Sequence, residues 1–147
     1  MSIAMPVIDP PQAVTQEPQE RRAANGRLCI DNLSDMDRNY AVAIHLSPLA
    51  GFFFPPAVVA PLILWLIRKD QSAYIDDHGR EMVNFLISFV VLHLLLGLAC
   101  LTIIGIPVAV VGIPTIWIVG VISTIRGAIA SGRSEYFRYP MTFRFLT

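Results

Sequence analysis

The residues that could carry chemistry gather at the edges of long apolar runs. Six of them form a candidate polar cluster near one membrane interface: His45, Trp65, His78, Glu81, Asn84 and Tyr139. Residues at i and i+4 share a helix face, so Asp77 and Glu81 could meet, with His78 beside them. Such side chains bind metals, but a site needs further ligands, and only His45 could join them. We therefore expect no metal and no cofactor.

His93 is the ionisable side chain nearest the middle of an apolar run. Such a residue is by default a candidate for a proton relay or a transport path. The alternative, which we favour, is a neutral imidazole bonded to a backbone carbonyl or another polar group. The sequence contains no glycine-rich phosphate loop, CxxC pair, HExxH or serine-elbow motif. We therefore expect no enzyme activity.

Composition indicates a membrane protein. Of 147 residues, 54% are hydrophobic and 15% are charged, whereas a soluble domain has roughly 25% charged residues. Residues 39–67 and 82–125 contain no Asp, Glu, Lys or Arg, and such runs are typical of transmembrane helices. The formal net charge is zero, so we expect lipid rather than nucleic acid as the partner.

The first part of the chain predicts a tail and then an interrupted helix. Residues 1–33 are rich in proline and polar residues, which predicts a disordered tail. Ser34 then fits the cap of a helix over 34–68. Four prolines interrupt this apolar segment: Pro48, Pro55, Pro56 and Pro61. One kinked span is favoured, and a re-entrant helical hairpin is the alternative, which leaves the side of the N-terminus open.

The second part predicts a helical hairpin. Residues 69–81 form a polar connector, and helices are expected over about 75–104 and 108–131, with the break at Gly105-Ile106-Pro107. Residues 133–147 alternate aromatic residues with arginines, which favours an extended segment along the membrane interface. An RNA-binding tail is the lesser alternative. The expected fold is an all-α membrane protein: a bundle of about three transmembrane helices over 34–147.

Packing and orientation follow from small and basic residues. Gly120, Thr124 and Ala128 recur every four residues, which favours packing against the middle helix or a homo-oligomer seam. Basic residues concentrate in the connector and near the C-terminus: Arg68, Lys69, Arg80, Arg126, Arg133, Arg138 and Arg144. The connector 69–81 and the C-terminus are therefore expected in the cytoplasm, with the protein in the plasma membrane as a multi-pass protein.

Several short motifs together resemble a known family. They are the stretches AIHLS at 43–47, PLILW at 61–65, Lys69, Asp76, His78, EMVNF at 81–85 and YFRYP at 136–140. This order, over roughly 35–145, resembles a domain-of-unknown-function family of small prokaryotic membrane proteins that is considered distantly related to the chloroplast inner-envelope translocon subunit Tic-twenty. The resemblance implies a helical integral membrane protein without established activity. Gly79 departs from it, since alanine is expected there.

These observations predict a structural or partner-binding component of a membrane assembly, with other membrane proteins as its partners. The alternative is a transporter, channel or translocon-like subunit with His93 and Asn84 on the path.

Overall fold

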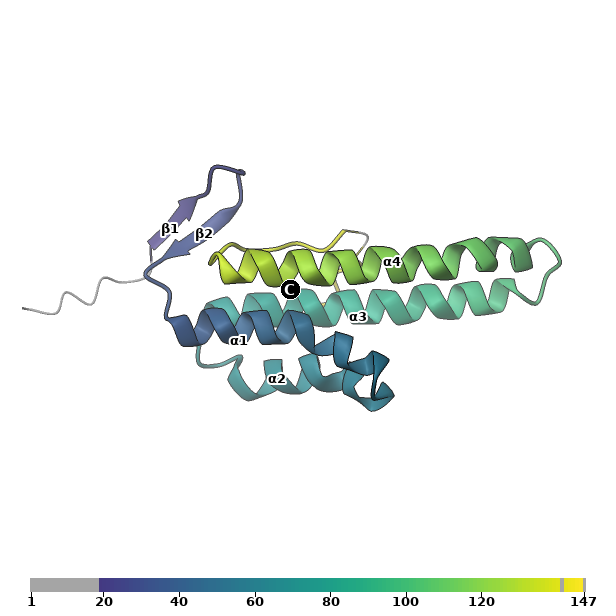
Figure 1. Ribbon diagram of the computed structural model, residues 1–147, viewed down its shortest axis with the longest axis horizontal. Coiled ribbons are helices and arrows are strands. Elements are labelled where there is room, and N and C mark those ends of the chain that lie inside the picture. The colour runs from purple at the N-terminus through teal and green to yellow at the C-terminus, as the bar shows by residue number, and fades with distance from the viewer. Residues whose placement is uncertain (1–18, 141, 147) are drawn as a thin grey trace, which may run out of the picture.

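The computed structural model describes residues 19–140 and 142–146, and helices dominate it (Figure 1). Its longest elements are α3 (Ala73–Ala99) and α4 (Gly105–Gly132), which form an antiparallel hairpin. Within the described part of the chain, these two helices are long and apolar enough to cross a membrane. The expected bundle of about three transmembrane helices is therefore not confirmed, whereas the mostly helical fold is.

The first apolar segment folds back on itself. It comprises α1 (Asp35–Leu46), the 3₁₀ helices η1 (Ser47–Phe52) and η2 (Pro55–Val59), and α2 (Ala60–Arg68). At 1.5 Å per residue, α1 and α2 are about 18 and 14 Å long, too short for a hydrocarbon layer of about 30 Å. The Tyr40 hydroxyl on α1 donates to the Leu64 carbonyl on α2 at 2.8 Å. The segment therefore has the hairpin shape of the re-entrant alternative, with Pro48, Pro55 and Pro56 in the two 3₁₀ helices at its tip.

The start of α1 is as the sequence predicts. The Ser34 hydroxyl accepts a hydrogen bond from the Asp37 amide at 3.0 Å and caps the helix. This bond satisfies one of the free amides at a helix N-terminus.

The turn of the long hairpin lies at 100–104, not at 105–107 as expected. Gly105 and Pro107 belong to the first turn of α4, where proline is tolerated because its missing amide has no partner there anyway. The Thr102 hydroxyl accepts from the Gly105 amide at 2.9 Å. A Cβ at Gly105 would lie 1.7 Å from the Ala99 carbonyl oxygen, so the close turn requires glycine.

Residues 19–31 form a β-hairpin, which corrects the expected disorder of the tail; residues 1–18 lie outside the described residues. Strand β1 (Gln19–Arg22) pairs antiparallel with β2 (Leu28–Asp31) around a turn in which Gly26 has a φ of 79°. Strand β2 is held from its other side by the C-terminal segment: the Ile30 amide donates to the Ser134 carbonyl, and the Tyr136 amide to the Leu28 carbonyl. This pairing orders a segment whose composition is that of a flexible tail.

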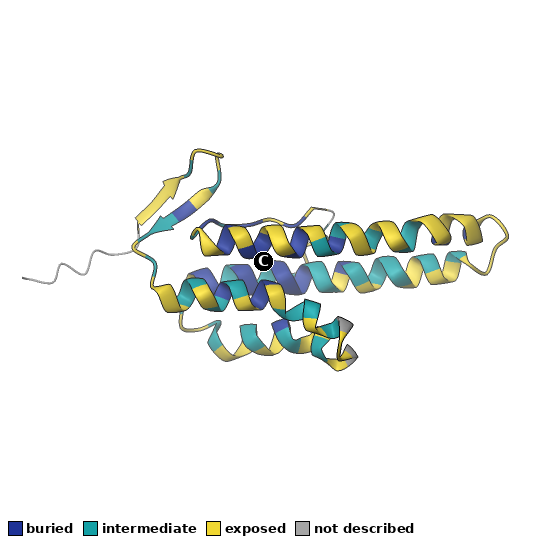
Figure 2. Ribbon diagram, in the orientation of Figure 1, coloured by how far each residue is buried: buried dark blue, intermediate teal, exposed yellow. Residues whose placement is uncertain are grey.

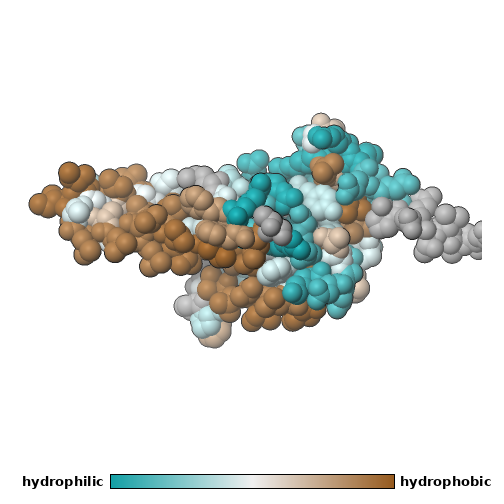
Figure 3. Space-filling view, turned by 180° about the vertical axis from the view of Figure 1, so that it is seen from behind, coloured by the Kyte–Doolittle hydropathy of each residue, from teal (hydrophilic) through white to brown (hydrophobic). Residues whose placement is uncertain are grey.

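Most buried residues lie in one half of the molecule. Figure 2 shows them where α1 and α2 cover the long hairpin, while the half that contains the turn is mostly exposed, apart from Gly105 and Ala109 of α4. On α3 every buried residue lies between Tyr74 and Ser88. Figure 3 shows hydrophobic side chains over the turn end and hydrophilic ones at the β-hairpin end. The charged groups and the protein core therefore share one end.

Candidate functional site

A buried hydrogen-bonded group of two histidines and a tyrosine lies at the centre of the covered half. A hydrogen bond of 2.7 Å joins His45 Nδ1 on α1 to the hydroxyl of Tyr139 in the C-terminal segment. Another of 2.8 Å joins His45 Nε2 to His78 Nδ1 on α3. Both histidines have 0% of their surface exposed, and Tyr139 has 5%. The group therefore connects three segments that are far apart in the sequence.

Small residues of α4 make room for this group. A Cβ at Gly127 would lie 2.7 Å from His45 Nδ1 and 3.0 Å from the Tyr139 hydroxyl. The Ser131 hydroxyl donates to the Gly127 carbonyl and lies 3.3 Å from His78 Nδ1. Gly127, which lies beside the stripe of Gly120, Thr124 and Ala128, thus faces His45 of α1 and Tyr139 of the C-terminal segment.

The homo-oligomer seam expected along this stripe is not a free surface. Thr124 and Ala128 are 3% and 7% exposed, and Gly120 is buried, with Phe89 of α3 3.3 Å from where its Cβ would lie. The stripe packs inside the chain, because re-entrant α1 and helix α3 already fill the space that small side chains leave.

Burial keeps the group neutral. Loss of solvation lowers the pKa of His45 to about 3 and raises the pKa of Tyr139 above its ordinary value. At neutral pH both side chains are therefore uncharged. They act as hydrogen-bond partners that fix the positions of α1, α3 and the C-terminal segment.

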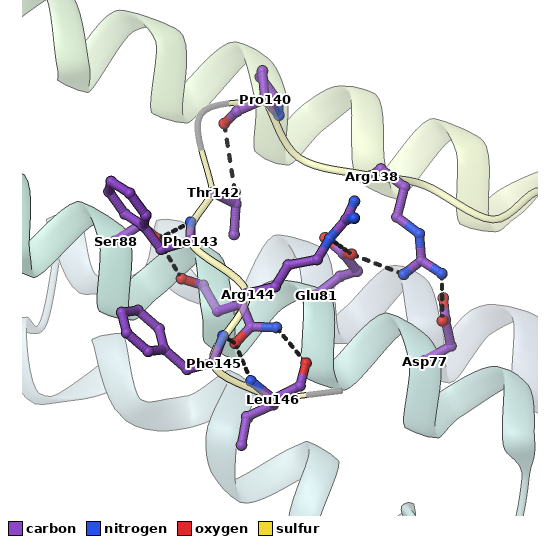
Figure 4. A network of polar contacts seen from close by, with 11 residues as sticks. Asp77, Glu81, Ser88, Arg138, Pro140, Thr142, Phe143, Arg144, Phe145 and Leu146 are labelled. Atoms are coloured by element: carbon purple, nitrogen blue, oxygen red, sulfur yellow. Dashed lines mark hydrogen bonds and ion pairs between the residues drawn. The ribbon is translucent and has the colours of Figure 1, made fainter.

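Glu81 of α3 belongs to a second, charged group (Figure 4). Its Oε1 accepts from Arg138 at 2.8 Å and from Arg144 at 3.2 Å, and Arg138 also pairs with Asp77 at 2.8 Å. The Glu81 side chain is only 3% exposed, and its Oε2 has no hydrogen-bond partner among the described residues.

The charged group lines an open cleft of about 720 Å³. Acidic and basic residues line it in equal number: Glu20, Asp76, Asp77 and Glu81 with Arg27, Arg80, Arg138 and Arg144. Because the two signs balance, the cleft presents a polar surface without a dominant charge.

Asn84 forms a third group with the last residues of the chain. Its Oδ1 accepts from the amides of Phe145 and Leu146 at 3.0 and 2.9 Å, and its Nδ2 donates to the Leu146 carbonyl. The Ser88 hydroxyl accepts from the Phe143 amide at 2.9 Å, as Figure 4 shows. Non-helical backbone at membrane depth needs such internal partners, because lipid offers none.

Trp65 and His93 lie in separate environments. The Trp65 indole donates to Asp76 Oδ1 at 2.8 Å, and its ring covers Gly79, where a Cβ would lie 2.1 Å from a ring carbon. His93 Nδ1 bonds the Phe89 carbonyl at 2.8 Å, and its ring lies against Phe89 and Trp117. The structure thus brings together His45, His78 and Tyr139, and it leaves Trp65, Glu81, Asn84 and His93 in other groups.

No metal centre forms in the described part of the chain, where no three His, Cys, Asp or Glu side chains are placed to hold an ion. His78 points toward His45, whereas Asp77 and Glu81 point toward Arg138. The two cysteines, Cys29 and Cys100, are both free.

Sequence reasoning missed several partners. They are Ser131, Asp76, Arg138 and Arg144, together with Tyr74, whose hydroxyl donates to the Ser131 carbonyl at 3.1 Å. Only the alternation of arginines with aromatics near the C-terminus is a usable signal, and it predicts an extended segment along the membrane interface. In fact Phe137 and Tyr139 are buried.

Comparison with known proteins gives one family. The family model described as "Magnetosome magnetite crystal formation protein family" (MamF/MmsF) matches residues 36–146, from early in α1 to the end of the C-terminal segment. This match supports a family of small membrane proteins and gives no relation to Tic-twenty. No curated protein and no solved structure matches the chain.

Proposed function

The chain belongs to the magnetosome magnetite crystal formation protein family, and we propose that it serves this process as a non-enzymatic structural component of the membrane. The observation that carries the proposal is how its polar side chains are used. Those of α1, α3 and the C-terminal segment are bonded mainly to one another, in a packed core. Such an arrangement supports a scaffold for partner proteins better than a path or a catalytic centre.

The proposed topology has two passes and one re-entrant hairpin. Helices α3 and α4 carry no charged residue between Glu81 and Arg126, which supports two crossings. The α1–α2 hairpin then enters and leaves on the side that holds the β-hairpin and the C-terminal segment. The basic residues of this side support a cytoplasmic location for it.

A transporter or channel is the alternative function. Two contacts favour the structural role over it. Both the carbonyl and the amide group of the Asn84 side chain are hydrogen-bonded to the C-terminal backbone. His93 bonds the carbonyl of its own helix at Phe89. A translocon-like role through a Tic-twenty relationship is a further alternative, which a protein-export defect in a deletion strain would support.

Replacement of the gene in a magnetite-forming cell tests the proposal. We expect His45→Ala, which breaks the core group, to alter the crystals seen by electron microscopy. His93→Ala should leave them as in the wild type, because this side chain bonds only within its own turn. Loss of crystals in His93→Ala at normal protein levels would favour the transport alternative.

The identity of the membrane is a separate part of the proposal. The family description favours the magnetosome membrane, and the plasma membrane is the alternative expected from the sequence. Fractionation of the same cells distinguishes the two. Crosslinking in the native membrane would identify the partner proteins that the scaffold role requires.

A further inference from the structure

The two halves of the molecule differ in cross-section. In the half with the charged end, α1, α2 and the tip between them pack beside α3 and α4, and Pro48 and Val58 of the tip line one cavity with Phe85 of α3 and Gly120 of α4. In the half with the turn, only α3 and α4 are present (Figure 1). Since packed helices lie about 8–10 Å apart, four helices occupy roughly twice the area of two.

The boundary between the halves lies near the middle of the long hairpin. The tip of the re-entrant segment reaches an apolar cavity of about 280 Å³ whose walls include Pro48, Val58, Val90 and Trp117. Val90 is equally far from Glu81 and from Ala99, about 14 Å at 1.5 Å per residue. With a hydrocarbon layer of about 30 Å, the tip ends at the bilayer midplane.

We propose that the protein is a membrane wedge that selects curved lipid surfaces. This inference rests on the topology proposed above, with α3 and α4 crossing the bilayer. The wide half displaces lipid in the leaflet next to the charged end, and the narrow half displaces about half as much in the opposite leaflet. In a bilayer that is convex toward the charged end, the leaflet on that side offers the extra area that the wide half needs. Insertion that is confined to one leaflet is sensitive to curvature.

Both halves present apolar side chains to lipid. Lipid therefore packs directly against the narrow half and against the wide half of the wedge. In the wide half, Ile63 and Ile67 are 52% and 61% exposed; in the narrow half, Leu98 and Val110 are 63% and 68% exposed. These four side chains lie outside the core. They offer positions where bulk can be added to either half without disturbing the packing.

The test uses the full chain in vesicles of phosphatidylcholine and phosphatidylglycerol extruded to several diameters. Trypsin added outside cleaves at the exposed Arg21 and Arg22 only in molecules whose charged end faces outward. We expect the ratio of cleaved to protected protein to rise severalfold as the vesicle diameter falls, because molecules with the charged end outward fit the convex leaflet. A ratio independent of diameter would overturn the inference.

Two pairs of variants separate shape from charge. Leu98→Trp with Val110→Trp widens the narrow half and should flatten the dependence on diameter. Ile63→Trp with Ile67→Trp widens the wide half and should steepen it; equal slopes in both pairs would contradict the wedge. Flotation and alkaline extraction report insertion separately. Protein that fails to insert contradicts the proposed topology, whereas inserted protein without size dependence contradicts only the wedge.

Discussion

The polar residues that the sequence singles out share a depth in the structure without sharing a network. His45, His78 and Tyr139 form one group, Glu81 pairs with arginines, and Asn84 holds the end of the chain. Side chains couple energetically when they are in contact, and they act additively when they have no common partner. Substitutions within one group should therefore be energetically coupled, whereas substitutions in different groups should have additive effects on stability.

A double-mutant cycle tests this division. His45→Ala should destabilise the fold by roughly 2 kcal/mol or more, because it removes the short hydrogen bonds that the buried Tyr139 hydroxyl and His78 Nδ1 make with the imidazole. Combined with Tyr139→Phe, it should show a coupling of about 0.5–3 kcal/mol. Combined with Asn84→Ala, it should be additive. Chemical unfolding in detergent micelles measures each variant, and strong His45–Asn84 coupling would contradict separate groups.

The fold should lose stability in acid through His45. Its pKa is lowered to about 3 in the folded protein by burial among His78, Tyr139 and the small residues of α4, whereas an unfolded histidine titrates near 6.5. Protons therefore favour the unfolded chain. Stability is full above pH 6.5 and falls by about 1.4 kcal/mol per pH unit below it, until about pH 3. Melting temperatures from pH 8 to pH 5 measure this loss.

The control for this pH dependence is His45→Gln, which keeps a polar side chain and removes the titrating one. Its melting temperature should fall less steeply between pH 6.5 and pH 5 than that of the wild type. Parallel curves for the two proteins would show that other groups cause the acid loss.

At the scale of elements, Gly79 fixes the approach of α2 to α3. Alanine usually favours a helix, but a Cβ here would lie 2.1 Å from the Trp65 ring. Gly79→Ala should therefore destabilise by about 1–3 kcal/mol through overpacking. The matched control is Gly97→Ala on the same helix, where nothing lies within 4 Å of the added Cβ. That variant should be neutral or up to about 1 kcal/mol more stable, and equal losses in both would contradict this account.

The attachment of the C-terminal segment is a second prediction at this scale. Asn84→Ala removes the acceptor of the Phe145 and Leu146 amides, and Ser88→Ala removes the acceptor of the Phe143 amide. A hydrogen bond contributes about 1 kcal/mol, so amide exchange should rise about fivefold at the affected positions. Exchange that rises uniformly over 142–146 in both variants would indicate one cooperative unit instead of two attachment points.

Much of the helical architecture could be predicted from the sequence. Charge-free runs locate α3 and α4, Ser34 marks the start of α1, and the prolines allow the segment to fold back. The turn is predicted at 105–107 because glycine and proline break a helix in its interior. The same residue types are tolerated in the first turn of a helix, and Gly105 and Pro107 lie in the first turn of α4. The β-hairpin was missed because β2 depends on pairing with residues 134–136, a contact that no local pattern carries. The Glu81–Arg138 pair was missed for the same reason.

At the scale of the whole molecule, lipid rather than water must surround the turn half. Ile118→Arg places a charge at an exposed position near mid-membrane, at a cost of about 2.5–3.5 kcal/mol. Ile129→Arg is the control, since this exposed position lies beyond Arg126 at the charged end. The first variant should reduce the fraction that resists alkaline extraction, and the second should not. Equal membrane retention would contradict the proposed crossings.

The turn at 100–104 also bears on biogenesis. Its side chains are those of Cys100, Leu101, Thr102, Ile103 and Ile104, so it carries no charge, and the Thr102 hydroxyl is occupied by the Ala99 carbonyl. Moving this loop across the membrane costs little free energy, because it has few polar groups without an internal hydrogen-bond partner. With the proposed crossings, the newly made chain needs to enter the membrane from one face only, as a preformed hairpin, and no hydrophilic domain between α3 and α4 has to be exported.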